Sequence, residues 1–260
     1  MKSLTPLLLL LALQLCAPAA QSKRDAPRRP APAAKAKAAP APKAGAGART
    51  IVCIDPGHPS EVASGRNMQN GTSETRTNWA VATKLRDALE ARGYEVVMTK
   101  SSEDELVKNR DRALVANRAG AALMIRLHCD ASTERGFAVY YPDRRGRARD
   151  GTTGPAPSVI EESRRAAEAV HSGLAEGLKD ALDDNGIRTD FQTKVGREQG
   201  GALTGSIFSE VPVVTIEMVV LSHDADADFI KTDEGQRRMA ESIARGVERY
   251  VAPSKAPREE

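Results

Sequence analysis

The chain has 260 residues, a formal net charge of +3 and only 3% aromatic residues. Residues 1–49 hold nine Lys/Arg and one acid, which leaves residues 50–260 with 29 Lys/Arg and 34 Asp/Glu. A basic segment therefore precedes a mildly acidic remainder. Because the sequence has no basic motif interleaved with aromatic residues, its composition does not favour nucleic-acid binding.

The first 19 residues have the pattern of a cleaved export signal. One Lys is followed by a nearly unbroken apolar run over residues 4–15, and Ala-Pro-Ala at 17–19 offers a cleavage site. The run is shorter than the roughly 20 residues that a membrane-spanning helix needs. We therefore expect a secreted protein without a membrane span, in the periplasm or else at the cell wall or outside the cell.

Residues 20–49 form a segment of biased composition. From residue 30 to residue 48 the chain uses only Ala, Pro, Lys and Gly, and such a segment cannot bury enough apolar surface to offset the entropy of ordering. We expect a semi-extended basic linker, whose lysines either contact anionic wall polymers or lipid or remain solvated. A single folded domain is then expected over residues 50–252, as a monomer, with a disordered tail over residues 253–260.

The three cysteines indicate neither a disulfide framework nor a zinc finger. Cys16 follows Leu15, whereas a lipid-anchor cysteine follows a small residue, so lipid anchoring at Cys16 is disfavoured. Cys53 and Cys129 lie in apolar runs. We expect both to be buried as small hydrophobic side chains.

From residue 50 onward, short β-rich runs alternate with amphipathic helical patterns. This alternation predicts an α/β fold with three layers, α/β/α, around a mostly parallel, mixed sheet of about six strands. The expected strands are 51–55, 94–99, 121–127, 137–141 and 213–217. The expected helices are 76–92, 105–118, 159–182 and 235–250, and residues 142–158 are expected to form a loop.

Unusual polar residues stand where expected strands end and a helix begins. His58 follows the first strand in Asp-Pro-Gly-His, His128 follows the third strand, Glu217 ends the strand VVTIE, and Glu74 opens the first helix. Two imidazoles and a carboxylate with an open fourth position are typical of catalytic zinc. A further carboxylate nearby can take a proton from water at such a site.

Each of these residues also has a simpler interpretation. His58 after Pro-Gly can be a turn histidine, and His128 can be a core histidine with satisfied hydrogen bonds. Glu74 can be a favourable charge on the first turn of a helix. Glu217 is harder to explain this way, because a carboxylate within an apolar strand is costly to bury without a partner. Spacing alone does not join the four residues into one site.

Four blocks of sequence, taken in order, resemble the motifs of N-acetylmuramoyl-L-alanine amidases of the amidase_3 type. They are IVCIDPGH, then SETRTNWAVATKLRDAL, then Arg and Ala-Asn before MIRLHCDAS, and last VPVVTIEMVVLSHDADADF. The resemblance spans about residues 50–251. It implies that His58, Glu74 and His128 hold a zinc ion and that Glu217 is the catalytic carboxylate.

The same resemblance implies the reaction. A zinc ion would polarise the amide carbonyl between N-acetylmuramic acid and L-Ala in peptidoglycan and lower the pKa of a water molecule. Glu217 would take that water's proton and return it to the departing amine. Asp55 or Asp130 is a candidate to hold the imidazoles through their second nitrogens, or is simply a turn former.

Three departures from the family pattern concern detail around the site. Arg126 stands where the family has a small residue, residues 218–220 replace x-Gly-Phe, and His223 replaces an Asn. His223 either approaches the site or is a solvated loop histidine. Some family members carry a helix that plugs the zinc site, but residues 142–158 are rich in Arg, Gly and Pro and predict no such plug.

Two other functions remain open at this point. The first is a zinc peptidase or deacetylase that acts on wall peptides or glycans with the same metal. The second is a non-catalytic peptidoglycan-binding module. The order of the ligands and the glutamate on the last strand disfavour the first, and an intact ligand set disfavours the second.

Overall fold

The computed structural model describes residues 49–62, 65–130 and 133–252. The expectations for residues 1–19, for the linker up to residue 48 and for the tail at 253–260 lie outside these ranges. Within the described part of the chain, every helix is too short or too polar to cross a membrane.

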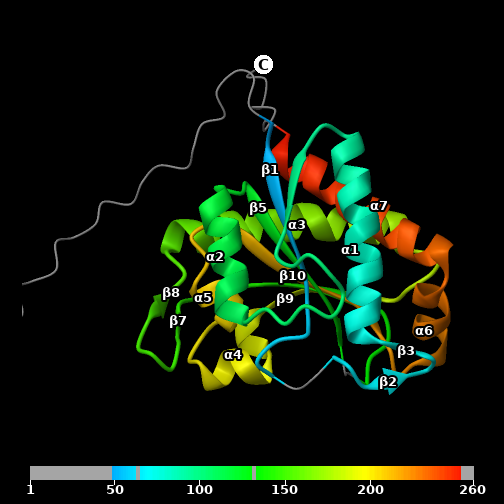
Figure 1. The fold of residues 1–260 in the computed structure, drawn as a ribbon, viewed down its shortest axis with the longest axis horizontal. Coiled ribbons are helices and arrows are strands. Elements are labelled where there is room, and N and C mark those ends of the chain that lie inside the picture. Colours follow the sequence, from blue (N-terminus) through cyan, green and yellow to red (C-terminus); the bar gives the residue numbers. More distant parts are fainter. Residues whose placement is uncertain (1–48, 63–64, 131–132, 253–260) are drawn as a thin grey trace, which may run out of the picture. The chain divides into compact units, whose positions relative to one another are not determined.

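A six-stranded sheet forms the centre of the folded domain, in the order β4-β1-β5-β10-β6-β9 (Figure 1). Neighbouring strands are parallel except for the pair β10 and β6. The sheet is thus mixed and mostly parallel, as the sequence predicts. In chain order the strands are β1 (Ile51–Pro56), β4 (Glu95–Met98), β5 (Leu123–Asp130), β6 (Phe137–Tyr141), β9 (Asp184–Thr189) and β10 (Val213–Val220).

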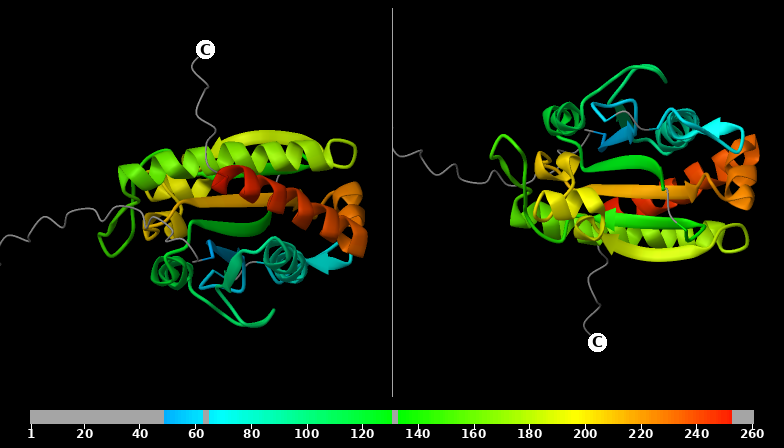
Figure 2. Two further views of the ribbon diagram at one scale, coloured as in Figure 1. Left: turned by 90° about the horizontal axis from the view of Figure 1, so that it is seen from above. Right: turned by 90° about the horizontal axis from the view of Figure 1, so that it is seen from below.

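Helices cover the sheet unequally on its two faces. The long helices α1 (Glu74–Ala91), α3 (Pro157–Leu178) and α7 (Asp233–Val251) form one layer with the larger part of the core, and Figure 2 shows α3 and α7 on the same side of the sheet. Helix α2 (Asn109–Ala119) packs on the other face around a smaller core. The predicted three-layer arrangement is therefore confirmed.

Short elements complete the described chain. Two small hairpins and four short helical segments connect the main elements. They are β2 (Met68–Gln69) with β3 (Thr72–Ser73), β7 (Gly146–Arg147) with β8 (Thr153–Gly154), η1 (Asp190–Gln192), α4 (Lys194–Glu198), α5 (Thr204–Ile207) and α6 (Asp224–Lys231).

Local chemistry sets several of the helix ends. The hydroxyl of Ser73 accepts a hydrogen bond from the Arg76 backbone N–H, 3.3 Å away, and so caps the N-terminus of α1. Thr232 caps α7 in the same way through the Gly235 N–H, at 2.9 Å. Gly120 ends α2 with a left-handed φ of 60°, a conformation that costs glycine little. The first helix therefore begins at Glu74.

Side chains alternate between the two faces of the sheet along each strand, and the candidate site residues of the strands lie on the face that α2 covers. Val52 and Ile54 of β1 lie in the large core below the three long helices, whereas Cys53 lies in the smaller core on the α2 side. Successive side chains of a strand point to opposite faces. By the same alternation, the α2 face also receives His128, between buried Leu127 and Cys129, and Glu217, between buried Ile216 and Met218.

Several element boundaries differ from the sequence-based expectations. β10 continues to Val220, so Glu217 lies inside a strand and not at its end, because the apolar residues 218–220 continue the β pattern. Its pairing with β5 becomes irregular between Glu217 and Val220, which is a local bulge. Likewise β5 runs to Asp130, so His128 is two residues before the strand end.

The bounds of two helices and the content of the expected loop also differ from the sequence-based expectations. α3 occupies Pro157–Leu178 and so ends four residues before the expected end at 182, and α2 starts at Asn109, four residues after the expected start at 105. The expected loop over 142–158 contains the hairpin of β7 and β8 and the first two residues of α3. Apart from those two residues, the described range 142–158 contains no helical residues.

Candidate metal centre

Three of the predicted site residues come together at the carboxyl ends of β1 and β5. His58, Glu74 and His128 each offer a ligand atom, and these atoms lie within 4.8 Å of one another. The Nε2 atom of His58 is 3.4 Å from Glu74 Oε2, and the Nδ1 atom of His128 is 3.0 Å from Glu74 Oε1. The rings of the two histidines meet edge to face, with centroids 5.2 Å apart.

The donor set fits a zinc ion. Tetrahedral ligand atoms about 2.1 Å from a zinc ion are roughly 3.4 Å from one another, which is the scale of the separations in this cluster. The chemistry of the donor set agrees with this spacing, because two imidazoles and one carboxylate are ligands that a catalytic zinc ion takes from proteins.

Glu74 is positioned for more than helix capping. Its Oε1 atom accepts a hydrogen bond from the backbone N–H of Cys129, at 3.2 Å, in addition to its contact with His128. Burial alone would raise the pKa of Glu74, but the hydrogen bond and charge of His128 outweigh it and lower the pKa. The side chain is therefore a carboxylate that joins the start of α1 to the end of β5.

His58 adopts an unusual backbone conformation. Its φ is +55°, in the left-handed region that residues with a Cβ seldom occupy. Such a conformation costs about 1 to 3 kcal/mol and persists only where the surroundings enforce it. The backbone of His58 is therefore held in place by its neighbours, and this conformation directs its imidazole toward Glu74.

The loop at residues 56–59 is fixed by side chains that bind its carbonyl groups. All four successive carbonyls accept hydrogen bonds, and the donors come from α1, α2 and the segment after β4. The bonds are Arg112 Nη1 to Pro56 O (2.7 Å), Asn78 Nδ2 to Gly57 O (3.1 Å), Lys100 Nζ to His58 O, and Arg112 Nη2 to Pro59 O (2.7 Å). Asn78 and Lys100 were not predicted from the sequence; the available signal was an Asn four residues before Ala82, on the apolar face of the expected helix.

Gly57 allows the His128 ring to approach the backbone. A Cβ atom at residue 57 would lie 2.4 Å from His128 Cε1 and 2.6 Å from His128 Nε2, which is too close for any side chain. The Gly-His pair of the Asp-Pro-Gly-His motif is therefore needed for the position of both imidazoles. Gly57 makes room for His128, and the next residue is His58 itself.

The electrostatics keep His58 ready to bind a cation. Burial lowers the pKa of His58 to about 4, with a further lowering from His128 and an opposing effect of Glu74. The ring is therefore neutral near pH 7. Since a metal binds only the neutral imidazole, His58 has no proton to lose at that pH.

Asp55 does not hold an imidazole, contrary to one of the two alternatives for that residue. Its Oδ1 atom accepts hydrogen bonds from Thr99 and Arg112, both at 2.6 Å, and its Oδ2 atom accepts one from Arg126 at 3.1 Å. Burial alone would raise the pKa of Asp55, but the two arginines outweigh it and hold the pKa well below its usual range. Asp55 therefore anchors Arg112, which in turn holds the 56–59 loop. The alternative role of Asp130 stays a prediction.

Replacing Asp55 by Asn should destabilise the fold by about 3 to 5 kcal/mol, because it leaves two buried arginines without their anion. The pH dependence of this stabilisation follows from the lowered pKa of Asp55. The carboxylate contributes stability above its unfolded pKa of about 3.9, and this contribution is lost as the pH falls through the lower folded value. Urea unfolding at pH 7 and at pH 3 measures both effects. Equal stability of the variant and the natural protein at pH 7 would refute this role.

Arg126, which replaces a small residue of the family pattern, is built into this buried cluster. Its Nη2 atom donates to Asn109 Oδ1 at 2.9 Å, and a Cβ atom on Gly205 would lie 2.8 Å from the Arg126 guanidinium carbon. Helix α5 thus packs directly on the guanidinium. Arg126 joins β5 to α2 and α5.

Glu217 lies next to the three candidate ligands. It is the direct register partner of His128 on the neighbouring strand, about 4.8 Å away between backbones. Its side chain is partly exposed, but its Oε2 atom is buried and has no hydrogen-bond partner within the described ranges. Burial, together with the charges of Glu74 and Asp130, raises the pKa of Glu217 well above its usual value.

Two other features lie outside the cluster. The Nε2 atom of His223 is 3.2 Å from the backbone carbonyl of Thr133, and His223 is not one of the three clustered residues.

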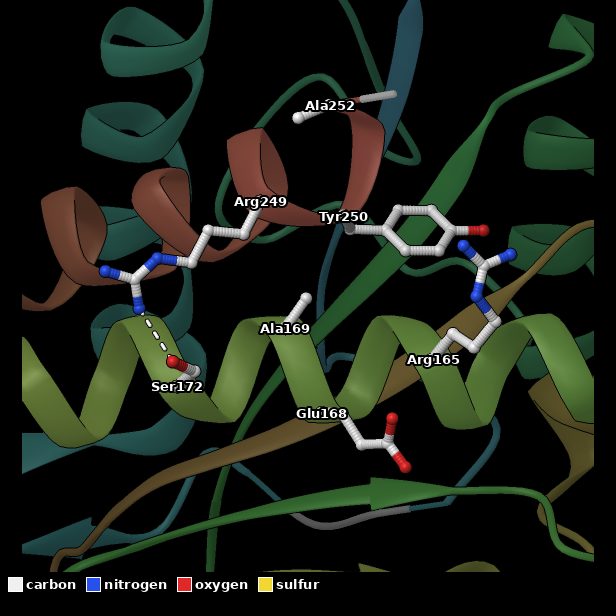
Figure 3. A pocket seen from close by; sticks show the side chains of 7 residues that line it. All are labelled: Arg165, Glu168, Ala169, Ser172, Arg249, Tyr250 and Ala252. Atoms are coloured by element: carbon white, nitrogen blue, oxygen red, sulfur yellow. Dashed lines mark hydrogen bonds between the residues drawn. The ribbon is translucent and has the colours of Figure 1, made fainter. Parts of the chain in front are cut away.

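A surface hollow of about 370 Å³ lies between α3 and the end of α7, on the helix layer of the opposite face (Figure 3). It is lined by Arg165, Glu168, Ala169, Ser172, Arg249, Tyr250 and Ala252.

A fold with a His-Glu-His cluster at the carboxyl end of a mostly parallel sheet is typical of metal-dependent hydrolases. The family model of the Amidase_3 N-acetylmuramoyl-L-alanine amidases matches residues 52–249. The chain therefore belongs to the Amidase_3 family.

Curated relatives and solved structures agree with this assignment. The chain is 27% identical over 232 residues to the N-acetylmuramoyl-L-alanine amidase AmiC of Neisseria meningitidis, covering 79% of this chain and 54% of that protein. It is 26% identical over 228 residues to the amidase Rv3717 of Mycobacterium tuberculosis, covering 79% and 88%. The chain thus spans about half of the Neisseria relative and most of the mycobacterial one.

The fold is similar to solved amidase structures. For the N-acetylmuramoyl-L-alanine amidase of Clostridium difficile 630 the TM-score is 0.62 at 24% identity, covering 80% of this chain and 99% of that one. For AmiC2 of Nostoc punctiforme the TM-score is 0.61 at 22% identity, covering 78% and 98%. At these identities the likeness concerns the fold alone.

Proposed function

We propose that this protein is a zinc-dependent N-acetylmuramoyl-L-alanine amidase that hydrolyses the amide bond between N-acetylmuramic acid and L-Ala in peptidoglycan. The observation that carries the proposal is the cluster of His58, Glu74 and His128, whose ligand atoms lie within 4.8 Å. Family membership supplies the substrate class. The product would be free stem peptide, released during wall remodelling or separation of daughter cells.

The three ligands and their supports have distinct tasks in this proposal. His58, Glu74 and His128 would hold the zinc ion, which supplies Lewis acidity toward the amide carbonyl and lowers the pKa of nearby water. The neutral His58 ring and the ionised Glu74 already have the protonation states that ligation requires. The bonds from Arg112, Asn78 and other donors to the 56–59 loop keep the His58 imidazole oriented before substrate binds.

Glu217 would handle the proton. As the register partner of His128, it stands at the edge of the ligand cluster. In its carboxylate form it accepts the proton of the attacking water, and it then donates that proton to the amine of L-Ala as the C–N bond breaks. Its raised pKa favours this return step, and the charge of a cation at the three ligands would lower the pKa again and favour the carboxylate form that accepts the proton.

The setting of the reaction is also part of the proposal. The amino-terminal pattern supports export to the periplasm, or else to the cell wall or the outside of the cell, and the basic linker would contact anionic wall polymers or lipid. We propose a monomer that acts on peptidoglycan.

The products of wall digestion test the proposed bond. Mass spectrometry of purified sacculi treated with the protein should detect intact stem peptides and glycan strands without peptides. Shortened stem peptides would identify a peptidase instead, and deacetylated sugars with peptides still attached would identify a deacetylase. Binding to sacculi without any product would identify a non-catalytic module.

A further inference from the structure

We infer that Arg188 forms a carboxylate-binding subsite beside the candidate catalytic centre, which selects stem peptides with a free carboxylate one residue away from the scissile amide. This inference rests on the proposed function. It concerns a residue of the edge strand β9 that has no part in the metal cluster.

Arg188 faces the same side of the sheet as Glu217. In the strand register Arg188 lies opposite Tyr140, and Tyr140 lies opposite Thr215. Glu217 is two residues beyond Thr215 on β10, and alternate residues of a strand share a face. Thr215 also lies opposite Arg126, so one row of side chains crosses the sheet from the buried cluster to the edge strand.

The distance between Arg188 and Glu217 suits the first two residues of an extended stem peptide. Two strand spacings of about 4.8 Å and two residues of about 3.3 Å place the Arg188 and Glu217 backbones roughly 12 Å apart. Two residues of extended chain span about 7 Å. The side chains of Arg188 and Glu217 extend from their backbones and cover the remaining distance. A substrate whose scissile amide lies at Glu217 therefore brings its second residue, the one after L-Ala, to Arg188.

Arg188 is accessible, whereas the other cation in the same row is not. The Arg188 side chain is 28% exposed, while that of Arg126 is 4% exposed and bound to Asp55. Tyr140 lies beside Arg188 and is only 7% exposed, so its buried ring is a fixed neighbour of the Arg188 side chain. The strand register places Tyr140 directly opposite Arg188, and the Arg188 guanidinium opposes the rise that burial causes in the pKa of Tyr140.

Arg188 has several partners, and its ion pair with Glu134 is the one most easily replaced. Its Nε atom also donates to the backbone carbonyl of Asn185 at 3.3 Å, and its side chain also pairs with Tyr140. Arg188 Nη2 is 2.6 Å from Glu134 Oε2, and the Glu134 side chain is 61% exposed. An exposed ion pair contributes only about 0 to 1 kcal/mol. A substrate carboxylate that arrives already oriented by the centre can therefore exchange with Glu134, and the planar fork of arginine suits such a group.

The chemistry of the stem peptide supplies the matching group. Where the second stem residue is a γ-linked D-glutamate, its α-carboxyl group stands one residue from the scissile amide, either free or as an amide. A free carboxylate would pair with Arg188, and a neutral carboxamide would not. The inferred subsite therefore distinguishes D-glutamate from D-isoglutamine at that position.

The test compares two synthetic substrates, N-acetylmuramoyl-L-Ala-D-Glu and N-acetylmuramoyl-L-Ala-D-isoglutamine, with the full chain and zinc. We expect kcat/KM to be about 10- to 100-fold higher for the free acid, mainly through KM, as a hydrogen bond to a charged group predicts. Arg188→Gln should bring the ratio close to one and leave turnover of the amidated substrate within about threefold. Arg188→Lys, which keeps the charge but not the fork, should retain part of the preference.

Arg164→Gln is the matched control. Arg164 is also paired with surface carboxylates, but it lies on α3, in the layer over the opposite face, so its loss should leave the substrate preference unchanged. A ratio near one in the natural protein would overturn the inference even if Arg188→Gln failed to fold, and so would an unchanged ratio in Arg188→Gln. Cleavage of neither substrate would instead contradict the proposed function.

Discussion

Replacing Glu217 by Gln is expected to lower kcat by about 10²- to 10⁴-fold, the usual contribution of a general acid or base, while the protein still binds one zinc ion. Gln has the shape of Glu but accepts no proton. The Oε2 atom is buried and has no hydrogen-bond partner within the described ranges, so the substitution breaks no bond at that atom. Because burial already raises the pKa of Glu217, the neutral side chain should leave the free energy of unfolding of the metal-free protein unchanged or slightly higher.

Steady-state kinetics, metal content and urea unfolding of the same preparation measure these three effects. Glu95→Gln is a suitable control, since Glu95 is exposed on the edge strand β4 and should change none of them. Full activity of Glu217→Gln would remove Glu217 from the reaction. Loss of zinc in that variant would make Glu217 a ligand and not a base.

Replacing Glu74 by Gln is expected to lower zinc affinity by more than about 100-fold and to abolish activity. Loss of residues that merely orient ligands already costs about 10- to 100-fold, and removing an anionic ligand should cost more. The start of α1 should survive, because Ser73 provides the cap. Zinc titration monitored by calorimetry, together with circular dichroism, separates the metal effect from a loss of helix.

This variant also distinguishes the two interpretations of Glu74. If Glu74 were only a favourable charge on the first turn, its loss would cost about 0.3 to 1 kcal/mol of stability and leave zinc affinity unchanged. Glu234→Gln provides the reference, because Glu234 is an exposed acid in the first turn of α7. Equal behaviour of the two variants would contradict the ligand role.

The predictability of the fold followed the strength of the apolar pattern. β1 and β5 are buried along nearly their whole length, and their runs of apolar residues are visible in the sequence. β9 reads DNGIRT, with Ile187 as its one apolar side chain, so no pattern marks it as a strand. It becomes a strand because β6 offers it a free edge, which is a tertiary effect.

The types of the site residues were predictable from the sequence, but the side chains that hold those residues in place were not. His58 and His128 stand out by following apolar runs, whereas the pairing of Glu217 with His128 depends on the order of β5 and β10 in the sheet. The role of Lys100 was not visible, because a hydrogen bond from a side chain to a distant backbone carbonyl leaves no sequence pattern. The partners of Asp55 were not visible for a related reason: the two arginines lie 57 and 71 residues away along the chain.

The central claim is that a zinc ion held by this chain is needed to cut the amide between N-acetylmuramic acid and L-Ala. The most direct measurement is the release of stem peptides from purified sacculi by the full chain, first stripped of metal and then titrated with zinc. We predict no release without metal and full release at one zinc ion per chain. Release by the metal-free protein, or none at any zinc concentration, would contradict the account.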